Sequence, residues 1–220
     1  MIGRRDGRKI PPRHAPPRYD CQVPAPRQPI VRATRARLRD GTPVTVRPVR
    51  KEDARYADAF FKWLSDETKY LRFMYQVKEL TPEILAGVLT QDGLRRVALV
   101  VEPSQLAPGD PTPAVAIGRY TPTEDPAVCE VAITVGDSWQ GRGVGRAVLA
   151  RLVTLAGRGG YSVMSAVALT TNSKMVGLAR SFGFEIHSEP DGITSMHRAL
   201  DPDGASGMAG AGIPRLHRPR

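Results

Sequence analysis

The chain has 220 residues, of which 41% are hydrophobic, and this length favours one folded domain with a core of ordinary size. No apolar run approaches the roughly 20 residues that cross a membrane, and the N-terminal sequence MIGRRDGRKIPPRH has no apolar segment typical of a signal peptide. Cys21 and Cys129 lack the spacing of a metal motif or a disulfide scaffold, so we expect a cytoplasmic protein without a metal site.

The net charge of +10 is concentrated at the N-terminus. Residues 1–40 contain 11 Lys and Arg against 3 Asp and Glu, whereas residues 41–200 contain 18 against 17. Residues 1–37 are rich in proline and arginine and show no hydrophobic periodicity, so we predict a disordered leader. A solvated tail is the favoured interpretation, and an arm that binds nucleic acid or an acidic partner is the alternative, although no aromatic interleaving supports base stacking. Residues 201–220 are predicted to form a flexible tail.

Residues 38–200 carry alternating strand and helix periodicities. In chain order we predict a strand over 41–49, helices over 51–64, 66–74 and 81–91, and strands over 95–102, 114–121 and 127–135. These are followed by a helix after the glycines at 141–145, a strand over 161–169, a helix over 173–182, and strands over 184–188 and 193–200. Ser65 and Thr81 are predicted helix caps, with Pro82 at the first helical position. The order predicts an α/β fold with a mixed, mostly antiparallel sheet flanked by helices, and a parallel crossover late in the chain.

The segment SWQGRGVGRAVLARL, residues 138–152, places three glycines immediately before a helix. It lacks the Gly-Lys-Ser/Thr of a P-loop and the third glycine of a dinucleotide fingerprint, which leaves the pattern Q-x-x-G-x-G of Gln140, Gly143 and Gly145. Unpaired amides at a helix start, bare of Cβ atoms, suit a pyrophosphate. Two interleaved arginines, Arg142 and Arg146, would add cationic donors. A turn that only packs a helix on the sheet remains the alternative.

The sequence AVCEVAITVGDSWQGRGVGRAVLARLV, residues 127–153, resembles the acetyl-CoA-binding core of the GNAT acetyltransferase superfamily. The family signature Q/R-x-x-G-x-G/A is matched by Gln140 to Gly145. An Asn that opens a helix ending in Gly-Phe is matched by NSKMVGLARSFGF, residues 172–184. The segments LRDGTPVTVRPVRKEDA, LSDETKYLRFM and ELTPEIL resemble the acetyltransferase domain of bacterial Pat-type protein-lysine acetyltransferases. The resemblance covers residues 38–200 and implies a GNAT fold.

The resemblance also implies acetyl-CoA as co-substrate and an amine as acceptor. In that family a strand binds the pantetheine arm through its backbone, and the Asn contacts the CoA arm. The turn that corresponds to Gln140 to Gly145, called the glycine turn below, binds the pyrophosphate. Asn172 is equally well interpreted as a plain N-cap. The cofactor-binding residues implied in this way are Ile133, Thr134, Val135, Gln140, Gly141, Arg142, Gly143, Val144, Gly145, Arg146 and Asn172.

An amine acceptor must lose a proton before it attacks, because a lysine begins with a pKa of about 10.4. Glu130 is the candidate general base. A carboxylate in the middle of so apolar a strand is costly unless it is paired or useful, and Glu130 also matches a glutamate of Pat-type enzymes. An exposed or salt-bridged strand residue is the alternative. The tyrosine that many GNAT enzymes use as general acid would fall at Ala179, so Thr171, Ser173 or water is left for that role.

These observations predict an N-acetyltransferase that moves an acetyl group from acetyl-CoA to a primary amine, with a protein lysine as the preferred acceptor. The alternatives are a small-amine acetyltransferase, a non-catalytic acyl-CoA sensor and a nucleic-acid-associated protein tethered by the leader. The helices over 52–90 would build the acceptor site, whose acidic residues either attract a cation or form a solvated face. Those acids are Asp66, Glu67, Glu79 and Glu83. The oligomeric state, including a homodimer, stays open.

Overall fold

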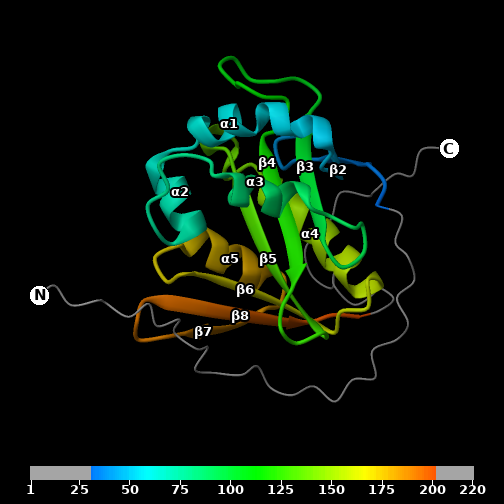
Figure 1. The fold of residues 1–220 in the computed structure, drawn as a ribbon, viewed down its shortest axis with the longest axis vertical. Coiled ribbons are helices and arrows are strands. Elements are labelled where there is room, and N and C mark those ends of the chain that lie inside the picture. Colours follow the sequence, from blue (N-terminus) through cyan, green and yellow to red (C-terminus); the bar gives the residue numbers. More distant parts are fainter. Residues whose placement is uncertain (1–30, 202–220) are drawn as a thin grey trace, which may run out of the picture.

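Eight strands form one mixed sheet in the order β1-β2-β3-β4-β5-β6-β8-β7 (Figure 1). The computed structural model describes residues 31–201. The strands are β1 (Thr34–Arg37), β2 (Pro43–Pro48), β3 (Val97–Pro103), β4 (Ala116–Pro122), β5 (Val128–Val135), β6 (Val163–Leu169), β7 (Glu185–Ser188) and β8 (Ile193–Ala199). The helices are α1 (Ala54–Trp63), α2 (Asp66–Phe73), α3 (Pro82–Leu89), α4 (Val144–Arg158) and α5 (Ser173–Ser181), with short 3-10 helices at Lys51–Asp53 and Asp137–Trp139. Within the described residues, none of these helices is long and apolar enough to cross a membrane.

Neighbouring strands run antiparallel from β1 to β5, and α4 then carries the chain to β6, which lies parallel to β5. Strand β8 runs antiparallel between β6 and β7. The predicted mixed, mostly antiparallel sheet with one late parallel crossover is confirmed. Each helix and strand predicted from residue 41 onward is present, with small shifts at its ends of the size common at element boundaries.

The predicted caps at two helix starts are also present. The Ser65 hydroxyl accepts a hydrogen bond from the Thr68 amide at 3.1 Å, and the Thr81 hydroxyl accepts one from the Ile84 amide at 3.4 Å. Pro82 is the first residue of α3. These local bonds fix where α2 and α3 begin on the sheet.

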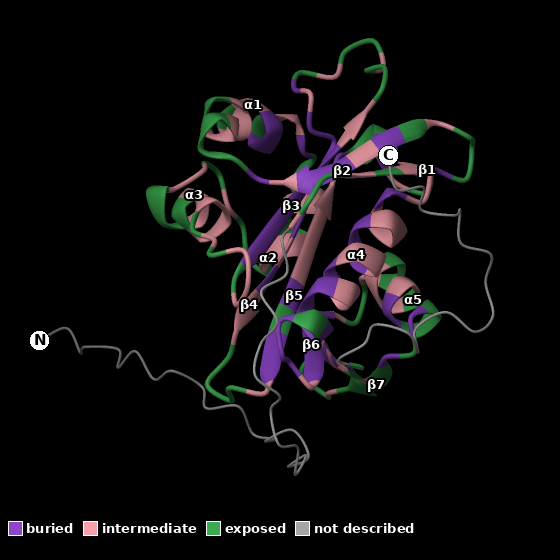
Figure 2. Cartoon of the chain, turned by 90° about the vertical axis from the view of Figure 1, so that its right-hand side faces the viewer, coloured by how far each residue is buried: buried purple, intermediate pink, exposed green. Residues whose placement is uncertain are grey.

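Helices cover both faces of the sheet, with α1 and α3 on one face and α4 and α5 on the other (Figure 2). The stripe of α4 that contains Val148, Leu149, Leu152 and Leu155 is at most 1% exposed and packs in the main core. A Cβ at Gly118 of β4 would collide with the Val148 side chain, so glycine lets α4 approach the sheet closely. This packing fixes the first turn of α4 relative to β5.

The structure corrects the predicted leader, because residues 34–37 form strand β1 at the sheet edge. Its TRAR sequence has no apolar alternation, and its order depends on pairing with β2, from Thr34 opposite Val46 to Arg37 opposite Pro43. Single-sequence periodicity cannot detect such a partner-dependent strand. Residues 1–30 of the predicted leader and residues 202–220 of the predicted tail lie outside the described residues.

Deleting residues 1–37 is expected to lower the free energy of unfolding by about 1–3 kcal/mol relative to deleting residues 1–30, because the first truncation removes β1 and the apolar contacts of its segment. Val31 and Ala36 pack against the main core. Urea unfolding of both truncated proteins measures the difference. Identical midpoints and slopes would show that β1 contributes nothing to the stability of the sheet.

A buried charge cluster joins the start of α1 to β2 and β3. The guanidinium of Arg47, which is 7% exposed, donates to both carboxylate oxygens of Asp53 at 2.8 Å and to Glu102 at 2.5 Å. The hydrogen bond from Arg47 is the main cause that lowers the pKa of Asp53. The cluster therefore stabilises the fold while Asp53 is ionised.

Replacing Asp53 with Asn is expected to cost about 2 kcal/mol of unfolding free energy at pH 7, because the buried charge of Arg47 would then be paired with the carboxylate of Glu102 alone. The folded-state pKa of Asp53 lies below its unfolded value of about 4, so this contribution is complete above about pH 5 and fades as the pH falls through the lowered pKa. Urea unfolding of the native and Asp53→Asn proteins at pH 7 and pH 3 tests this. A difference that grows toward acid pH would contradict it.

Candidate functional site

The two parallel strands in the middle of the sheet separate after only three residue pairs. Strand β5 pairs with β6 from Val128 opposite Val163 to Glu130 opposite Ser165. Beyond that point β5 continues beside β4, while β6 continues beside β8. Within the described residues, 131–135 therefore have a strand neighbour on one side only. Backbone groups along the open side can bind an extended ligand as they would bind another strand.

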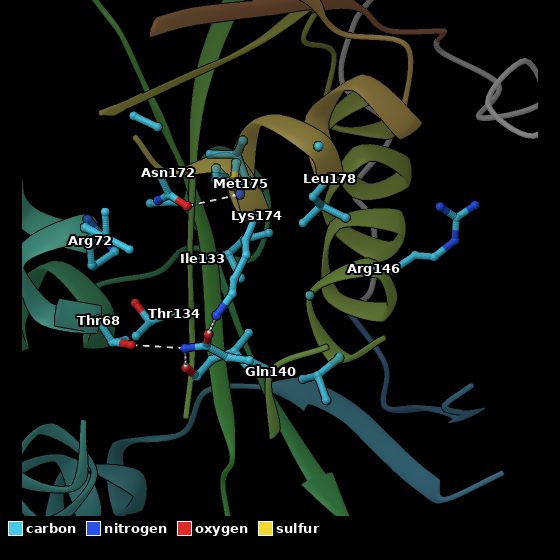
Figure 3. Close-up of a pocket in the computed structure, with 18 of the residues that line it drawn as sticks. Thr68, Arg72, Ile133, Thr134, Gln140, Arg146, Asn172, Lys174, Met175 and Leu178 are labelled. Carbon is cyan, nitrogen blue, oxygen red and sulfur yellow. Dashed lines mark hydrogen bonds between the residues drawn. The ribbon is translucent and has the colours of Figure 1, made fainter. Parts of the chain in front are cut away.

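A cavity of about 590 Å³ occupies this opening (Figure 3). Strands β5 and β6, the glycine turn, the first turn of α4, and helices α5 and α2 line it. Its volume is within the range of small-molecule and cofactor sites. The predicted site residues that line it are Glu130, Ile133, Thr134, Val135, Gln140, Gly141, Gly143, Val144, Gly145, Arg146 and Asn172. Arg142 is the predicted residue that the structure does not bring to this cavity.

The backbone conformation of the glycine turn requires glycine at two positions. Gly141 and Gly143 have φ angles of +73° and +96°, which other L-residues rarely adopt. Gly143 is the N-cap of α4 and supplies no side chain to the first amides of this 15-residue helix. Those amides and the positive end of the helix are thus available to an anion in the cavity.

The Arg142 side chain has a different role from the one expected. Its Nε donates to the Asp40 carboxylate at 2.7 Å, and one terminal nitrogen donates to the Thr42 hydroxyl at 3.1 Å. The guanidinium also lies 4.0 Å from the ring centroid of Trp139, which is buried. Arg142 therefore fixes the outside of the turn to the loop after β1. Asp40 and Thr42 are about 100 residues away from Arg142 in the sequence, so the sequence could not reveal these two hydrogen bonds.

Gln140 joins three elements at the cavity. Its Nε2 donates to the Thr68 hydroxyl at 3.0 Å and to the Val135 carbonyl at 3.2 Å, and its Oε1 accepts from Lys174 Nζ at 2.7 Å (Figure 3). Thr68 in turn donates to the Asp137 carboxylate at 2.7 Å. Gln140 thus holds α2, β5 and α5 together beside the turn, in addition to any contact that its backbone makes with a ligand.

Cations surround the turn end of the cavity. Arg146 lies over the Phe182 ring and donates to the Ser181 hydroxyl at 3.2 Å. Arg39 packs beside Gly143, and Lys174 reaches the cavity from α5. No pattern in the sequence indicates Arg39 or Lys174 as site residues, because contacts between loops and helices carry no periodic signal. Together with the free helix amides, three cations make this end suitable for a phosphate-rich group.

Asn172 is confirmed as a helix cap, and its contact with the CoA arm stays a prediction. Its side-chain oxygen accepts from the Met175 amide at 3.1 Å, which caps α5, and the residue also lines the cavity. Ala179 is fully buried in the core and does not line the cavity. The suggested acids Thr171 and Ser173 do not line it either, whereas three other hydroxyl residues do. These are Thr68, Thr134 and Ser181.

Glu130 lies at the point where the paired part of β5 gives way to the opening. It stands opposite Thr121 of β4 and Ser165 of β6, and its side chain is exposed while it borders the cavity. No cost of burying a carboxylate therefore applies to Glu130. Among the described residues that line the cavity, Glu130 is the one with a carboxylate side chain.

A mixed α/β sheet opened between two parallel strands, with a glycine turn and cations at one end of the opening, is suited to a long ligand with a phosphate end. A family model for the acetyltransferase (GNAT) domain matches residues 44–185. An acetyltransferase of Pseudomonas aeruginosa is 33% identical over 165 residues, which cover 73% of this chain and 86% of that protein. The chain therefore belongs to the GNAT acetyltransferase family.

Solved structures agree with this assignment. The GNAT domain of PAT from S. lividans has a TM-score of 0.67 and 30% identity, and the match covers 76% of this chain and 97% of that domain. A structure from Salmonella typhimurium with its cofactor acetyl-CoA has a TM-score of 0.57 and 21% identity, covering 76% of this chain and 99% of the other. The second likeness concerns the fold only.

Replacing Gly143 with Asp is expected to abolish measurable acetyl-CoA binding, because a carboxylate beside Arg39 at the start of α4 would repel the phosphates and compete with them for the cation. Gly192→Asp is the matched control, since Gly192 has a φ of +82°, open space for a side chain and no place at the cavity. Calorimetric titration with acetyl-CoA should show native affinity for the control. Native affinity in Gly143→Asp would exclude the turn as the phosphate site.

Proposed function

We propose that this protein is an N-acetyltransferase that moves the acetyl group of acetyl-CoA to a primary amine, with a protein lysine as the preferred acceptor and a small amine as the second candidate. The observation that carries the proposal is that Glu130 and the glycine turn line one cavity along the same strand. From Glu130 to Val135 the strand rises about 16 Å. An acyl thioester on a long amide-containing arm fits such an arrangement.

In this proposal the open side of 131–135 binds the amides of the arm, as a neighbouring strand would. The first amides of α4 bind the pyrophosphate, and Arg146 and Arg39 add positive charge. Lys174 contributes a further cation, for which its hydrogen bond to Gln140 must lengthen or be exchanged. A cytoplasmic location is also part of the proposal.

Acetyl-CoA supplies the acyl thioester, and the chain supplies proton transfer and position. Glu130 accepts a proton from the acceptor ammonium, directly or through water, so that the neutral amine nitrogen can form a bond to the acyl carbon. As the carbon–sulfur bond breaks, the nitrogen gives up its second proton and the leaving thiolate takes up a proton. Thr68, Thr134 and Ser181 line the cavity, so one of these hydroxyls or a water molecule relays this proton in place of the donor that Ala179 cannot provide.

A non-catalytic acyl-CoA sensor is the second candidate function. The observation that favours it is the buried Ala179, which leaves the usual position of the acid without a polar group. Thiol release from acetyl-CoA across a panel of peptides, polyamines and amino acids separates the two. Turnover with any amine supports the enzyme, and binding without turnover supports the sensor.

Replacing Glu130 with Gln is expected to lower turnover about 10²–10⁴-fold while the affinity for acetyl-CoA stays unchanged, because only the proton acceptor is lost. Glu185→Gln in β7 is the matched control, because Glu185 is exposed and does not line the cavity. Steady-state rates and calorimetry measure the two quantities. Full activity in Glu130→Gln would remove Glu130 from the role of base.

A further inference from the structure

The half-buried Arg72 is a cation at the cavity that does not belong to the proposed cofactor-binding residues. It lies in the last turn of α2 and lines the cavity, on the side from which Asn172 and Thr134 also approach (Figure 3). Its guanidinium makes no ion pair and no hydrogen bond to another described residue. The guanidinium carbon lies 5.0 Å from the centroid of the Phe73 ring. Burial lowers the pKa of Arg72 to about 10, so the side chain remains charged at pH 7 but is poorly compensated.

The charged groups around Arg72 leave an excess of positive charge. Glu130 is the acid that acts on it, while Arg119 of β4 repels it. Arg119 is committed to the Gly87 carbonyl of α3, to which it donates a hydrogen bond. The other charges of α2 lie toward its N-terminus, where Lys69 pairs with Asp66 at 3.4 Å. Glu130 thus acts on two guanidiniums, of which Arg72 lines the cavity and Arg119 does not.

This end of the cavity is complementary to a molecule that carries both charges. Glu130 can accept a hydrogen bond and then a proton from an ammonium group, while Arg72 can hold a carboxylate through two parallel N–H donors. A purely cationic acceptor would satisfy Glu130 and leave Arg72 without a partner, at an energetic cost.

We propose that Arg72 is a specificity-determining residue that binds a carboxylate of the acceptor, so that the preferred acceptors are amines that carry a carboxylate a few bonds away. Free amino acids and lysines followed by an acidic residue share this chemistry. The inference rests on the proposed function, because it names the acceptor class of the same acetyl transfer.

A matched pair of acceptors isolates the carboxylate. 5-Aminopentanoate and pentylamine present primary amines of similar basicity, with and without a carboxylate. Peptides in which Glu or Gln follows a single lysine provide the same comparison in a protein context. Thiol release with each acceptor gives kcat/KM. We expect the native protein to prefer the carboxylate member of at least one pair by about 10-fold or more, and the pair that shows the preference identifies the source of the carboxylate.

Arg72→Gln is expected to reduce that preference to near unity through KM of the carboxylate acceptor, while the rate with the acceptor that lacks the carboxylate and the affinity for acetyl-CoA change little. Arg72→Lys should keep part of the preference, because it retains the charge without the bidentate geometry. Arg158→Gln, an exposed arginine at the far end of α4, removes the same charge and should keep the native preference.

The outcomes separate this inference from the proposed function. Turnover without any preference in the native protein would overturn the inference and leave the acetyltransferase intact. An equal loss of activity toward both members of a pair in Arg72→Gln would also overturn it, because Arg72 would then act on Glu130 or on the fold. No turnover with any amine would contradict the proposed function itself, and the inference with it.

Discussion

The separation of β5 from β6 is the constraint on which the rest of the structure depends. Each strand has a full-length antiparallel neighbour on its outer side, β4 for one and β8 for the other, and the two share only the pairs from Val128 to Glu130. The opening leaves backbone groups without partners inside a sheet, which is unfavourable unless water or a ligand binds them. The cavity, the glycine turn and the cations are all arranged around this one gap.

The two ends of the gap differ in chemistry. At the end formed by α4, helix amides and cations from separate elements suit a phosphate group. At the other end, Glu130 and Arg72 present opposite charges at the exit of the paired strands. The hydrogen bonds of Gln140 join α2, which carries Arg72, to β5 and to α5. Gln140 therefore holds the two ends of the gap in a fixed position relative to each other. The same side chains that shape the fold thereby place the groups that suit the chemistry.

The sequence predicted the features that depend on neighbouring residues. Strand and helix periods, the Ser65 and Thr81 caps, and the turn of Gln140, Gly143 and Gly145 were all correctly located. Features that depend on distant partners were not predictable in this way. Strand β1 requires β2, the Arg142 side chain follows Asp40, and the exposure of Glu130 depends on where β6 leaves β5. The periodicity of a strand predicts which side chains share a face of the sheet. It does not predict where the pairing with a neighbouring strand ends.

The fully buried stripe of α4 spans both halves of the divided sheet, since it packs in the same core as β3, β4, β5 and β6. Within residues 31–201, the strand pairing between the halves is limited to the short segment from Val128 to Glu130. A ligand that binds along the open side of β5 would add bonds between the two halves. Because binding to the folded state stabilises it, such a ligand is expected to raise the stability of the segment that contains β6, β7 and β8.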